Sequence, residues 1–344
     1  MVDTDHSLLD IIGLQSIAFI SQHLGLSNTP DRIAIKTNNN DITLFKPSQF
    51  GHSLGLKIAA VRSNNPIQYN LSTVQASIIL NNIYTGAIQC IINATYLTAV
   101  RTAAGSALAT NIFANKHSTR LVLYGSGLQA KLHIQCVLLV RPMIQYITII
   151  NRTRSNAAKL IDELKLQYNH HNIVYNAIEW SYNLQLDENI DIICTTTNAS
   201  TPVLHSGMLN QVDHHQLHIN AIGSYTPDMI ELHDNIVSQC SVIIDTDSAK
   251  LCGDIAQCSN NNIVQGELGE YARLNADTLD RTIDCGIDDH VLQQCIQHRA
   301  KSIRPSPTNM TLFKSVGTAV QDMSAAYYCY NNALKHNIGT YISI

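Results

Sequence analysis

The spacing of apolar and polar residues predicts a sheet in the first part of the chain. Strands are expected at residues 32–36, 42–45, 53–61, 77–80 and 87–92. The first two alternate apolar and polar side chains, and the others are short apolar runs bounded by turn residues, both of which are typical of β-strands. After them, 98–115 is rich in Ala and Leu with few helix breakers, so we expect a helix there.

From residue 120 onward the pattern alternates between strands and helices. Strands are expected at 121–124, 146–150, 190–194, 218–222 and 242–245, and helices at 128–140 and 155–168. The second helix has an apolar face made of Ala158, Leu160, Ile161 and Leu164. Strands separated by helices predict βαβ units and a parallel sheet. Further along are a mixed helical stretch at 271–303, a boundary at Pro305 and Pro307, and a predicted helix at 313–334 that returns to the first domain.

Composition narrows the functional classes. The chain has 344 residues, of which 45% are apolar and 14% charged, with a formal net charge of −4. This balance allows a buried core and excludes global disorder, and it lacks the basic surface that nucleic-acid binding requires. No apolar run approaches the roughly 18 residues of a membrane-spanning helix, and acidic residues stand near the N-terminus, where a signal peptide is basic. The nine scattered cysteines form no CxxC pair, so we expect a cytoplasmic protein with reduced thiols and with neither nucleic acid nor membrane as partner.

A glycine-rich turn follows the strand expected at 121–124. It consists of Gly125, Ser126, Gly127, Leu128, Gln129 and Ala130, which form a GxGxxA sequence between an apolar strand and a helix. In this context the first glycine permits a tight turn, the second lets the backbone approach a pyrophosphate, and the small alanine lets the helix pack on the sheet. The pattern predicts that these residues bind a dinucleotide.

The end of the next strand indicates which dinucleotide is bound. NAD-binding folds usually carry Asp or Glu there, which accepts a hydrogen bond from the ribose 2′-hydroxyl. This chain has Asn151, Arg152, Thr153 and Arg154, with no carboxylate to repel a 2′-phosphate and two guanidinium groups to pair with it. We therefore expect NADP(H) as the preferred cofactor, with NAD(H) as the alternative.

Seven segments together carry a family resemblance. They are LGLK at 54–57, LTAVRTAAGSALA at 97–109, YGSGLQA at 124–130, NRT at 151–153, INAIGSYTPDMIEL at 219–232, GELGE at 266–270 and FKSVGTAVQD at 313–322. With these motifs the chain resembles the ornithine cyclodeaminase/μ-crystallin family over nearly its whole length. The resemblance implies an α/β protein and a homodimer. A Rossmann-type dinucleotide-binding domain, residues 116–305, would be inserted into a mixed α+β substrate and dimerisation domain, residues 1–115 plus 306–344.

The same resemblance implies a substrate site. Arg32, Lys57 and Arg101 match the positions that hold a substrate α-carboxylate beside the nicotinamide, and Lys36 lies close enough in sequence to take the place of Arg32. Three converging cations bind a small carboxylate tightly whatever the family. Lys57 and Arg101 are the expected catalytic residues, with Lys57 or a bound water as the proton donor. Ser315 is an expected substrate contact.

Cofactor contacts are also expected outside the glycine turn and residues 151–153. They are Thr102, Thr195, Thr196, Thr197, Ile222, Ser224, Val316 and Gly317. The three consecutive threonines follow a predicted strand and would line the cofactor through their backbone. Residues 315–317 match the family segment that closes over the nicotinamide.

One segment departs from the pattern of the cyclodeaminases. In ornithine cyclodeaminases, an Asp after the glycine of INAIG handles the substrate amine, and here that position is Tyr225. Asp228 stands three residues later at an apparent helix start, where we expect it to stabilise the helix N-terminus. The GSYTPDMIEL form is instead similar to the family's reductases of cyclic imines and to μ-crystallin, an NADPH-dependent ketimine reductase.

The resemblance therefore implies NAD(P)H-dependent reduction of a cyclic imine carboxylate by hydride transfer to C2. The expected substrate is Δ1-pyrroline-2-carboxylate or Δ1-piperideine-2-carboxylate, and the product is L-proline or L-pipecolate. The alternatives are an ornithine cyclodeaminase (a lyase), which Tyr225 and Arg152 disfavour, an alanine-dehydrogenase-like enzyme, and a non-catalytic crystallin-like binding protein. A pure binding protein need not keep a carboxylate clamp, which disfavours the last alternative.

Fifteen histidines raise the question of a metal site. His214 and His218 are spaced as ligands on a helix, but His218 opens a predicted strand. The adjacent pair His170 and His171 would point in two directions. No HExxH or clustered Cys/His set is present, so we expect no metal and no catalytic cysteine.

Overall fold

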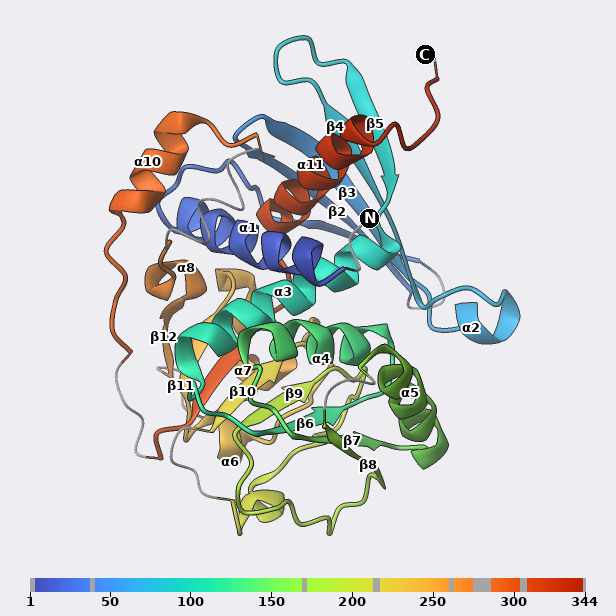
Figure 1. Cartoon of the computed structure of the whole chain (residues 1–344), viewed down its shortest axis with the longest axis vertical. Coiled ribbons are helices and arrows are strands. Elements are labelled where there is room, and N and C mark those ends of the chain that lie inside the picture. Colours follow the sequence, from blue (N-terminus) through green and yellow to red (C-terminus); the bar gives the residue numbers. More distant parts are fainter. Residues whose placement is uncertain are drawn as a thin grey trace. The chain divides into compact units, whose positions relative to one another are not determined.

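The computed structural model describes residues 4–37, 41–168, 172–212, 217–259, 263–274, 286–303 and 308–342. The chain forms two compact units (Figure 1). The first comprises Met1–Ala104, Arg273–Arg299 and Thr318–Ile344, and the second comprises Gly105–Ala272 and Ala300–Gly317, so the division falls within helix α3 (Thr95–Phe113). The functional domains expected at 1–115 plus 306–344 and at 116–305 stay a prediction. They differ from these units chiefly in the assignment of 273–299.

The first unit contains a sheet of five described strands. These are β1 (Ile33–Lys36), β2 (Ile42–Phe50), β3 (Ser53–Val61), β4 (Val74–Asn81) and β5 (Ile88–Asn93), each antiparallel to the next. One face is buried, because side chains at alternate positions of the central strands are covered, among them Leu44, Ala59 and Ile78. The short helix α2 (Asn65–Gln68) lies between β3 and β4 in the chain.

Helices pack on this sheet within the first unit. They are α1 (Asp5–His23), α10 (Asp289–Gln297) and α11 (Ala319–Lys335). Helix α11 packs on β2, β3 and β4, and α1 packs on α11 and α10 (Figure 1). The apolar pattern did not predict α1, because its side chains from Ile11 to Ser21 are all buried. A helix covered on every side has no single apolar stripe to distinguish it.

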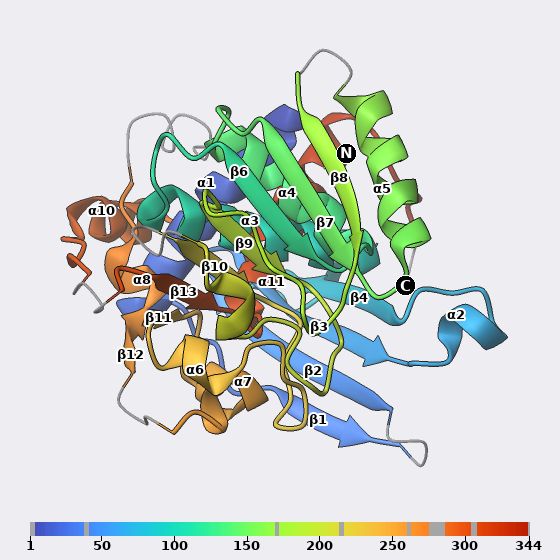
Figure 2. The ribbon, with the colours of Figure 1, turned by 90° about the horizontal axis from the view of Figure 1, so that it is seen from below.

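The second unit contains a parallel sheet of eight described strands, in the order β12-β11-β13-β10-β9-β6-β7-β8. Their bounds are β6 (Arg120–Tyr124), β7 (Tyr146–Asn151), β8 (Val174–Glu179), β9 (Ile192–Thr195), β10 (His218–Ala221), β11 (Ser241–Ile244), β12 (Val264–Glu267) and β13 (Thr311–Lys314). Figure 2 shows β6, β7 and β8 side by side. The strand order reverses between β6 and β9, which is the point where open α/β sheets bind their ligands.

Two apolar cores cover the two faces of the parallel sheet. The helical segments of this unit are α4 (Leu128–Val140), α5 (Arg154–Gln167), α6 (Asp234–Val237), α7 (Gly253–Ala256), α8 (Leu268–Tyr271) and two 3₁₀ turns, Ser206–Leu209 and Asp247–Leu251. Successive side chains of β6 alternate between the cores. Leu121 and Leu123 join the core formed with α4 and α5, and Val122 and Tyr124 join the core that contains residues of α6, α7 and the 3₁₀ turns.

The predicted strands and helices within the described residues are confirmed, mostly with boundaries shifted by a few residues, but the helix expected at 313–334 is wrong in its first part. Phe313 and Lys314 belong to β13, which is buried between β10 and β11. Helix α11 begins only at Ala319, where Thr318 and Gln321 form a capping box. The predicted boundary at Pro305 and Pro307 and part of the helical stretch at 271–303 lie outside the described residues.

Two smaller predictions are also corrected. Ala157, and not Ala158, lies on the buried face of α5 with Leu160, Ile161 and Leu164. Asp228 is exposed in a turn and no helix begins there. Proline at 227 and the surrounding polar residues favour the turn, and the next helix, α6, begins at Asp234.

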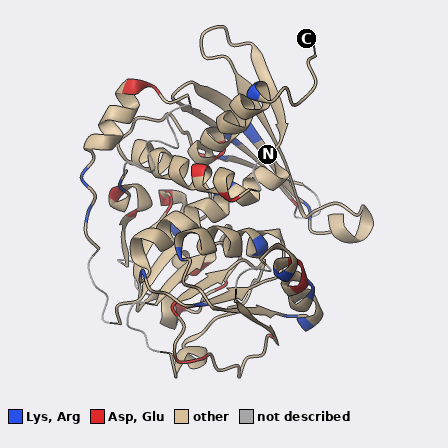
Figure 3. Cartoon of the chain, viewed as in Figure 1, with Lys and Arg blue, Asp and Glu red and all other residues tan. Residues whose placement is uncertain are grey.

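Charged side chains are sparse along the ribbon, and α5 carries the densest group of both signs (Figure 3). In the part of the chain that the structure describes, none of the helices is both long and apolar enough to cross a bilayer.

Candidate active site

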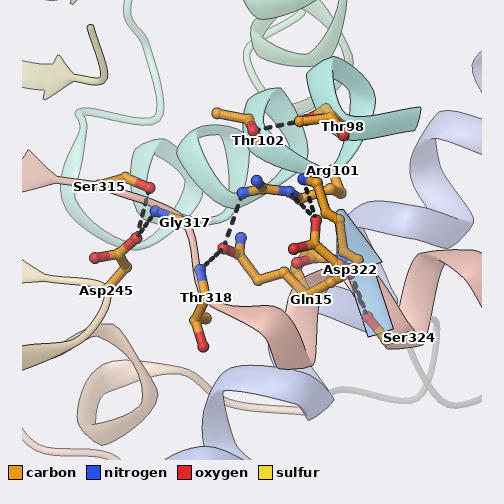
Figure 4. Close-up of polar contacts among 12 residues, drawn as sticks. Gln15, Thr98, Arg101, Thr102, Asp245, Ser315, Gly317, Thr318, Asp322 and Ser324 are labelled. Atoms are coloured by element: carbon orange, nitrogen blue, oxygen red, sulfur yellow. Dashed lines mark hydrogen bonds and ion pairs between the residues drawn. The ribbon is translucent and has the colours of Figure 1, made fainter. Parts of the chain in front are cut away.

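A buried group of charged side chains lies inside the first unit. Lys57 comes from the middle of β3, Arg101 from α3 and Asp322 from the first turn of α11. Lys57 Nζ lies 2.8 Å from Asp322 Oδ1, and Arg101 Nε donates to the same oxygen at 2.7 Å (Figure 4). All three side chains are at most 5% exposed. One carboxylate therefore holds two cations that the sequence predicted as catalytic.

The N-terminus of α11 fixes the orientation of Arg101. Thr318 caps this helix, and its backbone N–H donates to Gln321 Oε1 at 3.1 Å. Arg101 Nη1 donates to the same amide oxygen at 3.2 Å (Figure 4). The guanidinium is thus held by two neighbouring side chains of one helical turn, and this arrangement restrains its plane.

Two further cations complete the group. Lys46 in β2 stands directly opposite Lys57 in β3, and both side chains are buried. Arg32, half-buried before β1, acts electrostatically on Lys46 together with Arg101 and Asp322. We call Arg32, Lys46, Lys57 and Arg101 with Asp322 the cation cluster.

Burial and neighbouring charges shift the titration of this cluster. Burial and the nearby Arg101 lower the pKa of Lys57 to about 8, although Asp322 opposes the shift. Burial also lowers the pKa of Lys46 well below its ordinary value. Burial alone would raise the pKa of Asp322, but Arg101, Lys57 and Lys46 outweigh it, so that pKa lies below its usual range. Asp322 is therefore ionised at neutral pH.

The cluster has hydrogen-bond donors to spare for an anion. Within the described residues, Asp322 is the partner of the Lys57 ammonium, which has three N–H donors. Arg101 Nη2 makes no hydrogen bond in the same part of the chain. A small carboxylate is the ligand that such a pair binds best. Lys36, the alternative to Arg32, is exposed on β1.

The glycine turn of the second unit lies where the strand order reverses. Gly125 follows β6 with φ +105°, and a Cβ there would stand 2.7 Å from Thr196 Oγ1, so only glycine fits. Gly127 is the N-cap of α4, makes no side-chain cap and faces open space. The free amides at the start of this 13-residue helix fit a pyrophosphate, and Ala130 is fully buried against the sheet, as expected.

A buried carboxylate holds the loops that follow β9 and β10. Glu231 accepts from Thr195 Oγ1 at 2.8 Å, from the Thr197 backbone at 2.6 Å and from the Gly223 backbone at 2.6 Å. A Cβ on Gly223 would lie 1.8 Å from the Thr197 carbonyl oxygen, so the two loops touch through backbone. Asp254 in turn accepts from the Glu231 backbone at 2.7 Å. The predicted threonine segment is thus rigidly positioned.

A second buried carboxylate holds the segment that follows β13. Asp245 Oδ2 accepts from Ser315 Oγ at 2.8 Å and from the backbone of Val316 and Gly317 at 2.8 and 2.6 Å (Figure 4). Gly317 has φ +77°, which favours glycine. Ser315 is predicted as a substrate contact, and its hydroxyl proton is already directed at Asp245.

The end of β7 presents one guanidinium to solvent. Arg152 is exposed, and in the part of the chain that the structure describes it has no partner. Arg154, by contrast, donates to the Ala177 carbonyl at 2.9 Å. Asn151 donates to the Thr153 carbonyl at 2.9 Å and shapes the loop. These residues fit a 2′-phosphate on Arg152, with Arg154 committed to the fold.

The remaining predicted residues have structural contacts. Thr102 is buried in α3 and donates to the Thr98 carbonyl at 2.7 Å (Figure 4). Ile222 and Ser224 are buried after β10, and Ser224 donates to the Met229 carbonyl. Tyr225, which stands where cyclodeaminases carry Asp, packs against an apolar core of the second unit.

Four charged residues of these sites were not predicted as functional. They are Lys46, Glu231, Asp245 and Asp322. A sequence signal exists for each, because every one is a lone charge inside an apolar or small-residue segment. Buried charges of this kind are rarely tolerated without a partner, which makes such positions informative.

Metal ligands were not expected. Among the described residues, no group of three or more His, Cys, Asp or Glu is arranged to hold a metal ion. His218 is buried, with its Nδ1 2.8 Å from Thr311 Oγ1, and burial lowers its pKa to about 3. His170, His171 and His214 lie outside the described residues.

Comparison with known proteins relates the chain to one family. The family model described as ornithine cyclodeaminase/mu-crystallin matches residues 1–337. A Dictyostelium discoideum protein named an uncharacterized cyclodeaminase is 31% identical, over 98% of this chain and 96% of its own. A Delta(1)-pyrroline-2-carboxylate reductase of Bacillus cereus is 31% identical, over 90% of this chain and 88% of its own. The solved structure of the Thermococcus litoralis Delta(1)-pyrroline-2-carboxylate reductase in complex with NADH and L-proline has a TM-score of 0.80 at 25% identity. It covers 99% of this chain and 97% of its own.

Proposed function

The chain belongs to the ornithine cyclodeaminase/mu-crystallin family, and we propose that it is an NADPH-dependent reductase of a cyclic imine carboxylate. The proposed substrate is Δ1-pyrroline-2-carboxylate or its six-membered homologue, and the product is L-proline or L-pipecolate. The observation that carries the proposal is the buried pair of Lys57 and Arg101 on Asp322, which has free donors for one carboxylate. The Bacillus cereus and Thermococcus litoralis relatives, whose names state this reaction, support it.

Tyr225 favours the reductase over a cyclodeaminase. A cyclodeaminase needs a carboxylate at this place to handle the substrate amine, and the phenol of Tyr225 packs instead against an apolar core. Asp228 does not replace that carboxylate, because it is exposed in a turn. Hydride transfer to an imine needs no such base.

The proposed reaction assigns a task to each residue of the pair. Reduced nicotinamide, when bound, supplies a hydride to C2 of the imine. Arg101 and Lys57 hold the carboxylate on C2 and so orient the C=N bond. Lys57, whose pKa of about 8 is close to neutrality, gives a proton to the imine nitrogen. One C–H bond and one N–H bond form, the C=N bond becomes a single bond, and oxidised cofactor leaves.

The direct test is NADPH oxidation by the full-length protein with Δ1-pyrroline-2-carboxylate, with L-proline identified as the product. Ornithine alone and pyruvate with ammonia are run in parallel. The proposal requires NADPH to be consumed with the cyclic imine. Ammonia release from ornithine without net NADPH consumption would establish the lyase instead.

NADPH is the proposed cofactor because Arg152 is exposed and available at the end of β7. Replacing Arg152 by alanine is expected to raise the KM for NADPH about tenfold or more, because a charge-assisted hydrogen bond to the 2′-phosphate is lost. The KM for NADH, which has no 2′-phosphate, should change less than about twofold. Steady-state kinetics with both cofactors measure this, with Lys159→Ala on the exposed face of α5 as the control. Equal effects on the two cofactors would contradict the assignment.

The outer face of the five-stranded sheet supports a homodimer. Pro47, Leu56, Ile79 and Ile91 stand opposite one another in consecutive strands and are all partly exposed, with Ile91 at 63%. An apolar row of this kind marks an interaction surface, and we propose that a second copy of the chain covers it in a cytoplasmic dimer.

Replacing Ile91 by lysine is expected to convert this dimer into a monomer of 38.0 kDa, because a charge would be buried at the interface. Size-exclusion chromatography with light scattering measures the mass. Leu166→Lys, at a position 82% exposed on α5 of the second unit, is the matched control and should remain dimeric. A monomeric wild-type protein would refute the proposal.

A further inference from the structure

The cation cluster contains one lysine for which the proposed reaction has no use. Lys46 is the direct cross-strand neighbour of Lys57, so their side chains leave the sheet on the same face. That face is the one on which α11 packs. Lys46 is 4% exposed and Lys57 is 1% exposed, so both ammonium groups are withdrawn from water.

Charge is unevenly balanced in this group. The charges that act most strongly on Lys46 are those of Asp322, which favours its protonated form, and of Lys57, Arg101 and Arg32, which oppose it. Four cations and one carboxylate thus make up the cluster. Bringing like charges together away from water is costly unless anions compensate them. A substrate with one carboxylate leaves an excess of two positive charges, and protonating the imine increases that excess.

We propose that the substrate carries a second carboxylate, which Lys46 binds while Lys57 and Arg101 hold the carboxylate on C2. This inference rests on the proposed function, because it names the class of imine that the enzyme reduces. Two carboxylates and Asp322 together supply three negative charges against the four cations, and the developing iminium is then formed in a nearly neutral site. A cyclic imine dicarboxylate fits these requirements.

The test compares two imines that differ in one carboxylate. Wild-type enzyme is assayed by NADPH oxidation with Δ1-piperideine-2-carboxylate and with Δ1-piperideine-2,6-dicarboxylate. We expect kcat/KM to be at least about tenfold higher for the dicarboxylate, the effect of one charge-assisted hydrogen bond. Lys46→Met and Lys46→Gln should abolish this ratio, and Lys36→Met, which removes an exposed lysine of β1, should preserve it. Equal kcat/KM values in the wild type, or a preference that survives both Lys46 variants, would overturn the inference.

A binding measurement separates this inference from the proposed function. Glutarate and butyrate share a four-carbon acyl chain but carry two carboxylates and one, and the thermal unfolding of wild type and variants is followed with each. Stronger protection by glutarate that disappears in both Lys46 variants supports the second carboxylate site even if no imine is reduced. Reduction of Δ1-pyrroline-2-carboxylate together with equal protection by the two acids supports the reductase and overturns the dicarboxylate inference. The melting temperatures of the unliganded variants show whether each is folded.

Discussion

Replacing Lys57 by methionine is expected to lower kcat/KM for Δ1-pyrroline-2-carboxylate by about three orders of magnitude. The change removes a charged hydrogen bond to the substrate carboxylate and the proposed proton donor, and general acid catalysis alone contributes about 10²–10⁴-fold. Methionine has a similar length and suits the buried position, so packing is largely kept. Steady-state NADPH oxidation measures the loss.

The pH profile adds a readout that a packing role would not change. Lys57 is protonated below its pKa of about 8, so wild-type kcat/KM should fall as pH rises through that value. The groups that face it are Asp322, which favours the proton, and Arg101 and Lys46, which disfavour it. In Lys57→Arg the charge persists to high pH, so this alkaline fall should disappear although the rate is low. Full activity of Lys57→Met, or an unchanged alkaline fall in Lys57→Arg, would show that Lys57 is not the donor.

Asp322→Asn is expected to lower the free energy of unfolding by about 3–5 kcal/mol, because it leaves two buried cations without their counter-charge. The pKa of Asp322 is depressed in the folded protein, so its contribution is present above the unfolded pKa of about 4 and is lost as pH falls below it. The difference between wild type and variant should therefore be full at neutral pH and shrink in acid. Urea unfolding at several pH values measures it.

Two controls isolate the role of the buried charge at Asp322. Asp228→Asn removes an exposed carboxylate from a turn and should change the free energy of unfolding by less than about 0.5 kcal/mol. Adding Lys57→Met to Asp322→Asn removes one unpaired cation and should restore part of the loss, which a double-mutant cycle reports. If Asp322→Asn were as stable as wild type at neutral pH, the carboxylate would not be the counter-charge of the cluster.

The secondary structure could be predicted wherever its periodicity was visible. The strand at 53–61 and the helix at 128–140 agree with the structure at both ends, because each alternates or repeats against a single core face. Helix α1 could not be predicted from periodicity, because it is buried on all sides. The strand β13 was taken into a helix because four residues in the middle of a buried sheet carry no alternation that separates them from an apolar helical turn.

The candidate site was only partly visible in the sequence. Lys57 and Arg101 could be selected through the family resemblance, since from composition alone each would pass for a surface charge. Asp322 belongs to a quoted motif, yet its role depends on contacts with residues 265 and 221 positions away. Lys46 shows its inward direction only through its register with Lys57. Burial of a charge is a tertiary property, so local pattern could not reveal it.

The chain places several of its few charged side chains in its interior. Lys46, Lys57, Arg101, Asp322 and Glu231 are all buried. Dissolved ions screen exposed charges over a Debye length of about 8 Å at physiological ionic strength, but they act far less on buried pairs. The surface, meanwhile, meets water largely through neutral amides, hydroxyls and imidazoles. The electrolyte content of the surroundings therefore has little hold on the fold, and the protein is suited to a cell whose internal salinity varies.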